Sequence, residues 1–372
     1  MIPDFAYQSV WLTILLLLCI KHSGFLLKHD DYESLRNRES SGYRGGLLLL
    51  FFVSLYFGLR PISMIFPDMT GYAFSYSFDS YEVSTVRNEP VWQIVKYICH
   101  ELLSFNVNLW FLSVALIAFS FKFAACKKIF GNHIYTAFLF LLTSFSFWAN
   151  AVTTLRSNMG IAFVMYAIAL FLDDNNKNKV WAFIWFILGF YTHSSSILLA
   201  ACFLVSYYFI KHIKWAIYIW LFCLMLSLFA HSFFEQLFLS LGFDDRMAMI
   251  DSANVDYSGF AYSGFRWDFL AYSIIPLLLG LFVFPRDSKN TVYSILLNTY
   301  ILSNAFWVLV IRAQFSDRFA SISWSMYPLV LAYPFIFINV WDDSQPGKLN
   351  LALWGQMMFL LFMQIYYTIR IS

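Results

Sequence analysis

Charged residues are scarce in this sequence. Asp, Glu, Lys and Arg make up 12% of its 372 residues, roughly half the share found in a soluble globular domain. That scarcity excludes a soluble globular chain, and the net charge of +2 gives no indication of nucleic-acid binding. Cysteine is rare too: the five cysteines are scattered, with neither disulfide nor zinc spacing. We expect them to be small apolar packing residues.

Motifs for nucleotides and metals are missing as well. The sequence has no Gly-rich phosphate loop, no His-Glu-x-x-His and no ATP-binding module. Its Asp pairs fall in loops that we expect to be cytoplasmic, apart from Asp244-Asp245. No metal and no cofactor is therefore predicted.

Long hydrophobic runs dominate the chain, which is 60% hydrophobic. Runs of about 20 apolar residues match the ~30 Å thickness of the hydrocarbon core of a bilayer. They predict an all-α polytopic membrane protein with about twelve transmembrane helices in a single domain over residues 1–372. The expected spans are 5–27, 45–66, 105–125, 132–150, 157–172, 180–192, 194–210, 215–235, 268–285, 291–311, 319–340 and 350–369. The first run lacks a cleavage pattern, so we interpret it as a retained helix.

The spans at 180–192 and 194–210 are short. They meet at His193, followed by Ser194, Ser195 and Ser196. We predict a broken or re-entrant helix pair around His193.

Basic residues in short loops predict the orientation of the chain, because cytoplasmic loops collect Lys and Arg. One set of loops carries Lys28, Arg36, Arg38, Arg44, Lys127, Lys128, Lys177, Lys179, Lys211, Lys214, Arg286, Lys289 and Lys348. If these loops are cytoplasmic, both termini are external.

Arginine has a different distribution from lysine. Lys96 is the only lysine expected on the outer side, whereas eight arginines lie at or near that face: Arg60, Arg87, Arg156, Arg246, Arg266, Arg312, Arg318 and Arg370. The planar guanidinium group binds phosphate with paired donors and keeps its charge. This set therefore indicates an anionic, phosphorylated ligand; the alternative is that each side chain extends to lipid phosphate.

Two outer loops are long enough for function, at 67–104 and 236–267. After Pro90 the first has apolar residues at helical spacing, which predicts an amphipathic helix on the membrane surface. The second is rich in Tyr, Gly, Ser and Asp, which favours contact with sugars. An aromatic interface belt is the alternative.

Several short motifs along the chain resemble those of a known protein family. They are Arg60 with Pro67-Asp68-Met69-Thr70-Gly71-Tyr72, Glu89-Pro90-Val91-Trp92, Leu155-Arg156 through Ala162, His193-Ser194-Ser195-Ser196, and Asp317-Arg318-Phe319 before Tyr333-Pro334. In their order and spacing the sequence resembles the EpsG/Wzy family of polysaccharide polymerases. The usual Gly/Thr-Asp-Tyr order is changed here around Asp68.

The resemblance implies a GT-C-like transferase membrane domain in the bacterial inner membrane, with its active face periplasmic. It implies an O-antigen or polysaccharide polymerase that joins undecaprenyl-diphosphate-linked oligosaccharide repeats. Implied partners are membrane lipid, a chain-length regulator and a flippase, with no nucleic acid. Other functions left open are a lipid-linked glycan transporter and another outer-face transferase, such as an O-antigen ligase or a membrane acyltransferase.

Glycosyl transfer without a metal needs cations for the leaving diphosphate and a base for the acceptor hydroxyl. We predict that the diphosphate is bound by Arg156, Arg318, Arg266, Arg312 and Arg60. Predicted catalytic residues are His193, Asp68 and Asp317. Predicted sugar-binding residues are Tyr72, Glu89, Tyr257, Tyr262, Trp267 and Asp268. Two alternatives stay open: His193 and its serines satisfy backbone groups at the break, and Asp268 and Asp317 are ion-pair partners of the neighbouring arginines.

Overall fold

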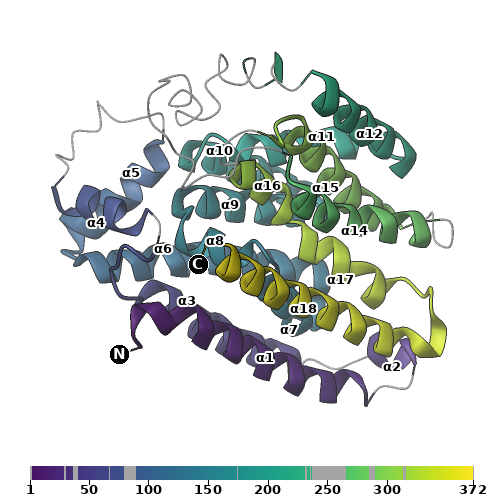
Figure 1. Ribbon diagram of the computed structural model, residues 1–372, viewed down its shortest axis with the longest axis horizontal. Coiled ribbons are helices and arrows are strands. Elements are labelled where there is room, and N and C mark those ends of the chain that lie inside the picture. Colours follow the sequence, from purple (N-terminus) through teal and green to yellow (C-terminus); the bar gives the residue numbers. More distant parts are fainter. Residues whose placement is uncertain are drawn as a thin grey trace. The chain divides into compact units, whose positions relative to one another are not determined.

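The computed structural model describes residues 2–28, 31–36, 41–66, 68–78, 89–173, 175–230, 233–234, 236, 265–284, 290–312 and 316–371. Every regular element within these ranges is helical (Figure 1). The chain divides into two compact units, each described by itself: residues 1–196 with 331–372, and residues 197–330. The prediction of an all-α protein is confirmed, while the single domain and the GT-C-like arrangement stay predictions.

The first unit holds most of the helices. They are α1 (Tyr7–Leu26), α2 (Tyr32–Arg36), α3 (Ser41–Gly58), α4 (Met69–Phe78), α5 (Pro90–Tyr97), α6 (Val107–Phe130), α7 (Ile134–Leu142), α8 (Phe147–Val152), α9 (Leu155–Phe171), α10 (Asn176–Thr192) and α18 (Gln345–Ile371), with short turns at Asp4–Ala6, Ile98–Leu102, Gly131–His133 and Asp342–Ser344. Within it, α9 packs against both α6 and α10, and α3 packs against α6. Helix α9 is almost wholly buried, which places it at the centre of this unit.

The second unit contains α12 (Ile213–Phe229), α14 (Trp267–Val283), α15 (Thr291–Leu309) and α16 (Ser316–Trp324). Helices α11 (Ser196–Tyr208) and α17 (Tyr327–Phe337) each cross the division between the units. A buried polar network joins the elements of this unit. Asn304 accepts a hydrogen bond from Trp220 Nε1 (2.8 Å) and donates to the hydroxyls of Ser273 (3.2 Å) and Ser323 (3.1 Å). Because every group of the amide side chain is partnered, the network is inexpensive to bury.

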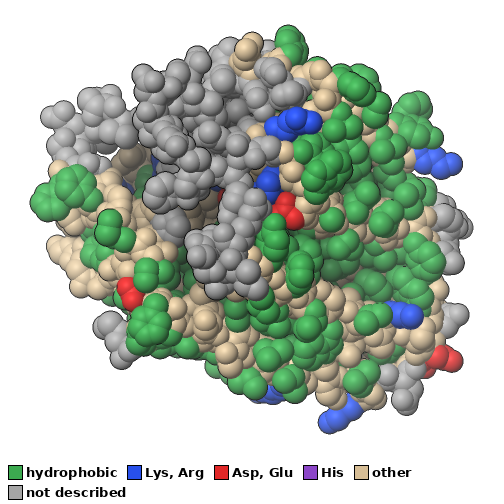
Figure 2. Space-filling view, viewed as in Figure 1, with side chains coloured by type: hydrophobic (Ala, Val, Ile, Leu, Met, Phe, Trp, Pro, Cys, Tyr) green, Lys and Arg blue, Asp and Glu red, His purple; other side chains and the backbone are tan. Residues whose placement is uncertain are grey.

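Within the part of the chain that the structure describes, five helical stretches are long and apolar enough to cross a membrane. They are Asp4–Leu26, Val107–Leu142, Thr291–Leu309, Ser316–Phe337 and Gln345–Tyr367, accompanied by shorter apolar helices such as Leu155–Phe171 and Trp267–Val283. Hydrophobic side chains also cover much of the face seen in Figure 2, where charged side chains are few. These helices fit the predicted membrane protein, and the count of about twelve spans stays a prediction.

Two predicted spans are interrupted in the structure. The span expected at 132–150 is divided between α7 and α8, and the span expected at 319–340 between α16 and α17. At the first interruption the hydroxyls of Thr143 and Ser144 donate to the carbonyls of Leu139 and Leu141. At the second, the hydroxyl of Ser325 donates to the carbonyl of Ile322. Such local bonds offer the backbone an alternative to regular helix and bend or end it.

The helix predicted after Pro90 is present as α5, with a π-helical turn after it. It buries Trp92 and Lys96, and the Lys96 ammonium donates to Ser75 Oγ at 2.8 Å. Its opposite face exposes Ile94 and Tyr97, with Leu102 beyond them. An apolar face turned outward supports the prediction that this helix lies against the membrane surface.

Candidate functional site

Three side chains that are far apart in the sequence meet in the first unit. The Glu89 carboxylate accepts a hydrogen bond from Arg156 Nη1 at 2.6 Å, and its other oxygen lies 2.5 Å from His193 Nδ1. The Glu89 side chain is only 7% exposed, against 19% for Arg156 and 25% for His193. The site is therefore a buried carboxylate between two basic groups that solvent can still reach.

Glycines bring the helices that carry these groups together. A Cβ atom added to Gly160 of α9 would lie 3.0 Å from the carbonyl oxygen of Gly189 of α10, and one added to Gly189 would lie 3.0 Å from the carbonyl oxygen of Gly160. Only residues without a side chain allow this approach. Arg156 precedes Gly160 by four residues and His193 follows Gly189 by four, so both lie about one helical turn beyond the contact.

The break at His193 has its own backbone bonds. Helix α10 ends at Thr192, and His193 adopts extended backbone geometry. Its amide donates to the carbonyl of Gly189, and its carbonyl accepts from the amide of Ser196. The predicted break is confirmed. The main chain satisfies these groups, so the imidazole ring is directed to Glu89 and does not serve to satisfy the backbone.

The electrostatics of the site keep Glu89 ionised. Burial raises the pKa of Glu89, but the hydrogen bond from His193 and the positive charge of Arg156 together bring it below its ordinary value of 4.5. An ionised carboxylate only accepts hydrogen bonds, so Nδ1 of His193 is the protonated nitrogen. In the neutral ring, Nε2 then carries the lone pair and can accept a proton.

Aromatic rings extend the site toward α4. The guanidinium carbon of Arg156 lies 5.9 Å from the centre of the Tyr72 ring, whose centre is 5.8 Å from that of Trp92. Asp68 precedes α4 in the left-handed region (φ 63°), and its carbonyl accepts from the amide of Tyr72. Tyr72, predicted to bind sugar, is thus next to the predicted diphosphate-binding Arg156.

Arg60 occupies a different environment. It is 2% exposed, and its two terminal nitrogens donate to the carbonyls of Phe57 (2.5 Å) and Val152 (3.2 Å). Its guanidinium carbon also lies 5.3 Å from the ring centre of Phe111. These donors are directed at the polypeptide, which gives Arg60 a structural contact of its own; its binding to diphosphate stays a prediction.

The second unit carries the other predicted arginines. Arg266 makes a two-pronged contact with Asp268, from Nε to Oδ1 (2.9 Å) and from Nη2 to Oδ2 (2.7 Å). Its guanidinium carbon lies 3.4 Å from the ring centre of Phe269. The structure therefore favours the interpretation of Asp268 as an ion-pair partner over a sugar contact. Trp267 is 67% exposed.

The remaining predicted residues are Arg312, Asp317, Arg318, Tyr257 and Tyr262. The guanidinium carbon of Arg312 lies 5.6 Å from the ring centre of Phe265. Asp317 and Arg318 occupy the first turn of α16, where Asp317 is exposed and Arg318 half-buried. Tyr257 and Tyr262 lie outside the described residues. Within the described ranges no group of three or more His, Cys, Asp or Glu side chains is arranged to hold a metal ion.

Two features of the site were not predicted from the sequence. Glu89 was expected to contact sugar, yet it joins Arg156 and His193; an acidic residue directly before a helix-starting Pro90 in a chain with few charges was the available signal. The second is Lys122, which is 3% exposed and donates to Asn158 Oδ1 at 2.5 Å, two residues from Arg156. The expected span ended at residue 125, whereas α6 continues to Phe130 and places Lys122 well inside the helix.

The apolar helices and the buried carboxylate between arginine and histidine are typical of a polytopic membrane protein with an ionic site. The chain is a member of the EpsG family, the family of Wzy-like polysaccharide polymerases, whose model matches residues 46–371. The resemblance seen in the sequence is thereby confirmed, and with it a general role of the polysaccharide polymerase kind. No curated protein and no solved structure is similar enough to count as a match.

Proposed function

We propose that this protein is a glycosyltransferase that polymerises undecaprenyl-diphosphate-linked oligosaccharide repeats on the periplasmic face of the bacterial inner membrane. The hydroxyl oxygen of one lipid-linked repeat forms a bond to the anomeric carbon of another chain. The bond from that carbon to the diphosphate breaks, and undecaprenyl diphosphate leaves with the electron pair. The proton of the hydroxyl passes to a base in the site.

The observation that carries this proposal is the contact of Glu89 with both Arg156 and His193. It holds a permanent cation and a titratable ring in one small region, which suits a step that develops negative charge while it releases a proton. Arg156 also lies in the first turn of α9, and the N-terminal end of a helix favours an anion.

Arg156 is proposed to bind the diphosphate. Its Nη1 is engaged with Glu89, but a guanidinium group has five N–H donors. Among the described residues its Nε has no hydrogen-bond partner although it is buried. A buried donor left without a partner costs stability, and an anion bound beside Tyr72 would satisfy it.

His193 is proposed to be the base, acting through Nε2, and Glu89 to be the residue that positions it. Glu89 fixes the proton on Nδ1 and stabilises the positive ring that forms when Nε2 accepts the proton of the acceptor hydroxyl. This role replaces the predicted sugar contact of Glu89, whose carboxylate is occupied by its two partners. Arg318, Arg266, Arg312, Asp68 and the sugar-binding residues stay predictions, as do the chain-length regulator and the flippase.

Chain-length analysis of the surface glycan tests the proposal. In a strain without this protein we expect lipid A-core that bears a single repeat, whereas loss of a flippase or a ligase leaves no repeat attached. Arg156→Ala should collapse long chains to single repeats at normal protein level, a loss of about 3 kcal/mol or a hundredfold in rate. Arg156→Lys should rescue poorly, because an ammonium group lacks the planar fork. Normal polymer from Arg156→Ala would contradict the proposal.

A further inference from the structure

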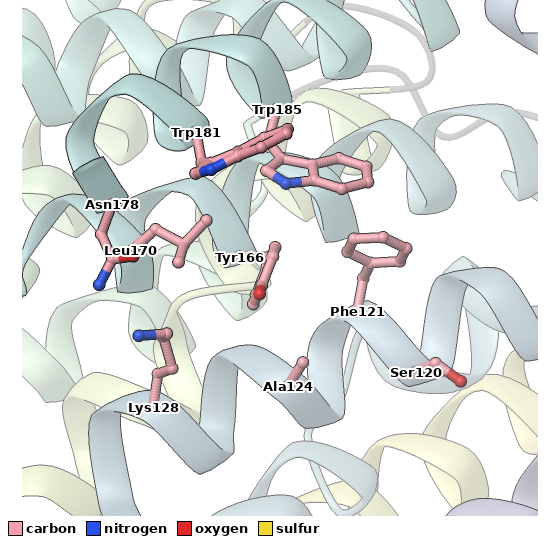
Figure 3. Close-up of a pocket in the computed structure, with 9 residues that line it drawn as sticks. All are labelled: Ser120, Phe121, Ala124, Lys128, Tyr166, Leu170, Asn178, Trp181 and Trp185. Atoms are coloured by element: carbon pink, nitrogen blue, oxygen red, sulfur yellow. The ribbon is translucent and has the colours of Figure 1, made fainter.

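A cavity in the first unit lies apart from the Glu89 site. It has a volume of about 530 Å³ and opens between α6, α9 and α10. That volume is within the usual range for sites that bind small molecules. Figure 3 shows Lys128 and Asn178 at one end of the opening and the rings of Phe121 and Trp185 at the other.

The apolar wall of the cavity consists of aromatic rings that contact one another. The ring centre of Phe121 lies 4.4 Å from that of Trp185 and 5.4 Å from that of Tyr166. Trp181 stands at the mouth and is 57% exposed. Such a wall presents an apolar surface, which suits a flexible hydrocarbon chain.

The polar end carries one cation and one amide. Lys128 Nζ lies 3.1 Å from Asp173 Oδ2, and Asn178 donates to the same oxygen at 2.6 Å. Both members of the ion pair are about a third or more exposed, so the pair is weak and can be opened at little cost. Lys177 and Lys179 flank Asn178 in the first turn of α10 and add positive charge near this end of the cavity.

We propose that this cavity binds an anionic phospholipid of the bilayer, with its phosphate at Lys128 and Asn178 and one acyl chain along the rings of Phe121, Tyr166 and Trp185. The charge of the polar end and the apolar wall match the two halves of that molecule, and lysines at a membrane surface attract anionic headgroups. This site takes a membrane lipid and does not depend on the glycosyl transfer proposed above.

Photolabelling of the full-length protein in detergent tests this proposal. The probe is phosphatidylglycerol with a diazirine in its acyl chain, and the labelled positions are mapped by peptide mass spectrometry. We expect labels on the segments around Phe121, Tyr166 and Trp185. Unlabelled phosphatidylglycerol should remove them at about tenfold lower concentration than phosphatidylcholine, because the zwitterionic lipid carries no net charge for Lys128 to bind.

Two variants and a matched control locate the site. Lys128→Glu should lower labelling about tenfold, and Ala124→Trp, which fills the cavity, should lower it whatever the headgroup. Lys127→Glu changes the same charge one residue away, where the ammonium lies 4.9 Å from the ring centre of Tyr43, and should label as the wild type does.

Three results would overturn the proposal. One is equal loss of labelling in Lys127→Glu and Lys128→Glu, which indicates general attraction to charge. Another is unchanged labelling in both Lys128→Glu and Ala124→Trp. The last is displacement of the probe by a polyprenyl phosphate at lower concentration than by phosphatidylglycerol, which would make the carrier lipid the occupant.

Discussion

Replacement of Glu89 by Gln changes one atom and tests the whole site. The carboxylate accepts from Arg156 and from His193 Nδ1. An amide has one acceptor and one donor group. Because Arg156 only donates, the amide oxygen must face it, and the NH₂ group must then face His193. Nδ1 becomes the acceptor, so the ring proton moves to Nε2 and the proposed base is lost.

The expected loss follows from these contacts. A weakened charge-assisted contact to the transition state corresponds to about 3 kcal/mol, or a hundredfold in rate. An amide in place of the carboxylate that orients a catalytic histidine lowered turnover about 10⁴-fold in the serine-protease triad. We therefore expect Glu89→Gln to reduce turnover by about 10² to 10⁴ at near-normal protein level.

The assay is extension of a synthetic polyprenyl-diphosphate-linked repeat by purified protein, followed by product length. Glu101→Gln is the matched control. Glu101 also contacts a histidine, at 2.8 Å from His100 Nδ1, but this pair is exposed to solvent, with side-chain exposures of 43% for Glu101 and 35% for His100. That variant should retain activity. Wild-type turnover in Glu89→Gln, or equal loss in the two variants, would refute the reasoning about the site.

Three further outcomes are expected. Gly160→Ala places a Cβ 3.0 Å from the carbonyl oxygen of Gly189 and should lower both activity and the midpoint of thermal unfolding. Gly355→Ala is the control, because its Cβ has no neighbour within 4 Å, and it should change neither. Equal midpoints in the two variants would contradict the close packing of α9 against α10. Asn304→Ala leaves the indole of Trp220 unpartnered and should cost about 2 kcal/mol of unfolding free energy, and Trp220→Phe should add little in that background. The pKa of Glu89 is lower in the folded protein than its ordinary value of 4.5. The ionised carboxylate therefore contributes its full stabilisation of the folded state above about pH 4.5 and loses it as the pH falls through the folded-state pKa. The thermal midpoint of the wild type should fall more steeply with acid than that of Glu89→Gln.

Much of the fold could be predicted from hydrophobicity alone. Helices in a bilayer must satisfy their own backbone groups, so long apolar runs become helices with little dependence on the rest of the chain. Arg156 at the start of α9 and the break at His193 were visible for the same reason, since polar residues interrupt apolar runs there. The interruptions after Leu142 and Trp324 were missed, because they depend on hydroxyl groups bonding to nearby carbonyls.

The composition of the site was less predictable. Glu89 contacts Arg156, which is 67 positions further along the chain, and His193, which is 104 positions further. No local sequence pattern determines such a pairing. The pairing depends on the packing of α9 against α10 at Gly160 and Gly189. In the sequence these glycines cannot be told from other small residues. Lys122 was placed too near a helix end, because the lysines that follow it suggested an earlier boundary than Phe130.

The carboxylate of Glu89 also affects the charge balance of the site. Without it, the guanidinium group of Arg156, which is only 19% exposed, would have no counter-ion, and a buried charge without a partner is costly. Glu89 therefore acts as a built-in counter-ion for Arg156. Under the proposed function, a diphosphate would share Arg156 with this carboxylate, and the leaving carrier would be held less tightly than by an arginine without a counter-ion.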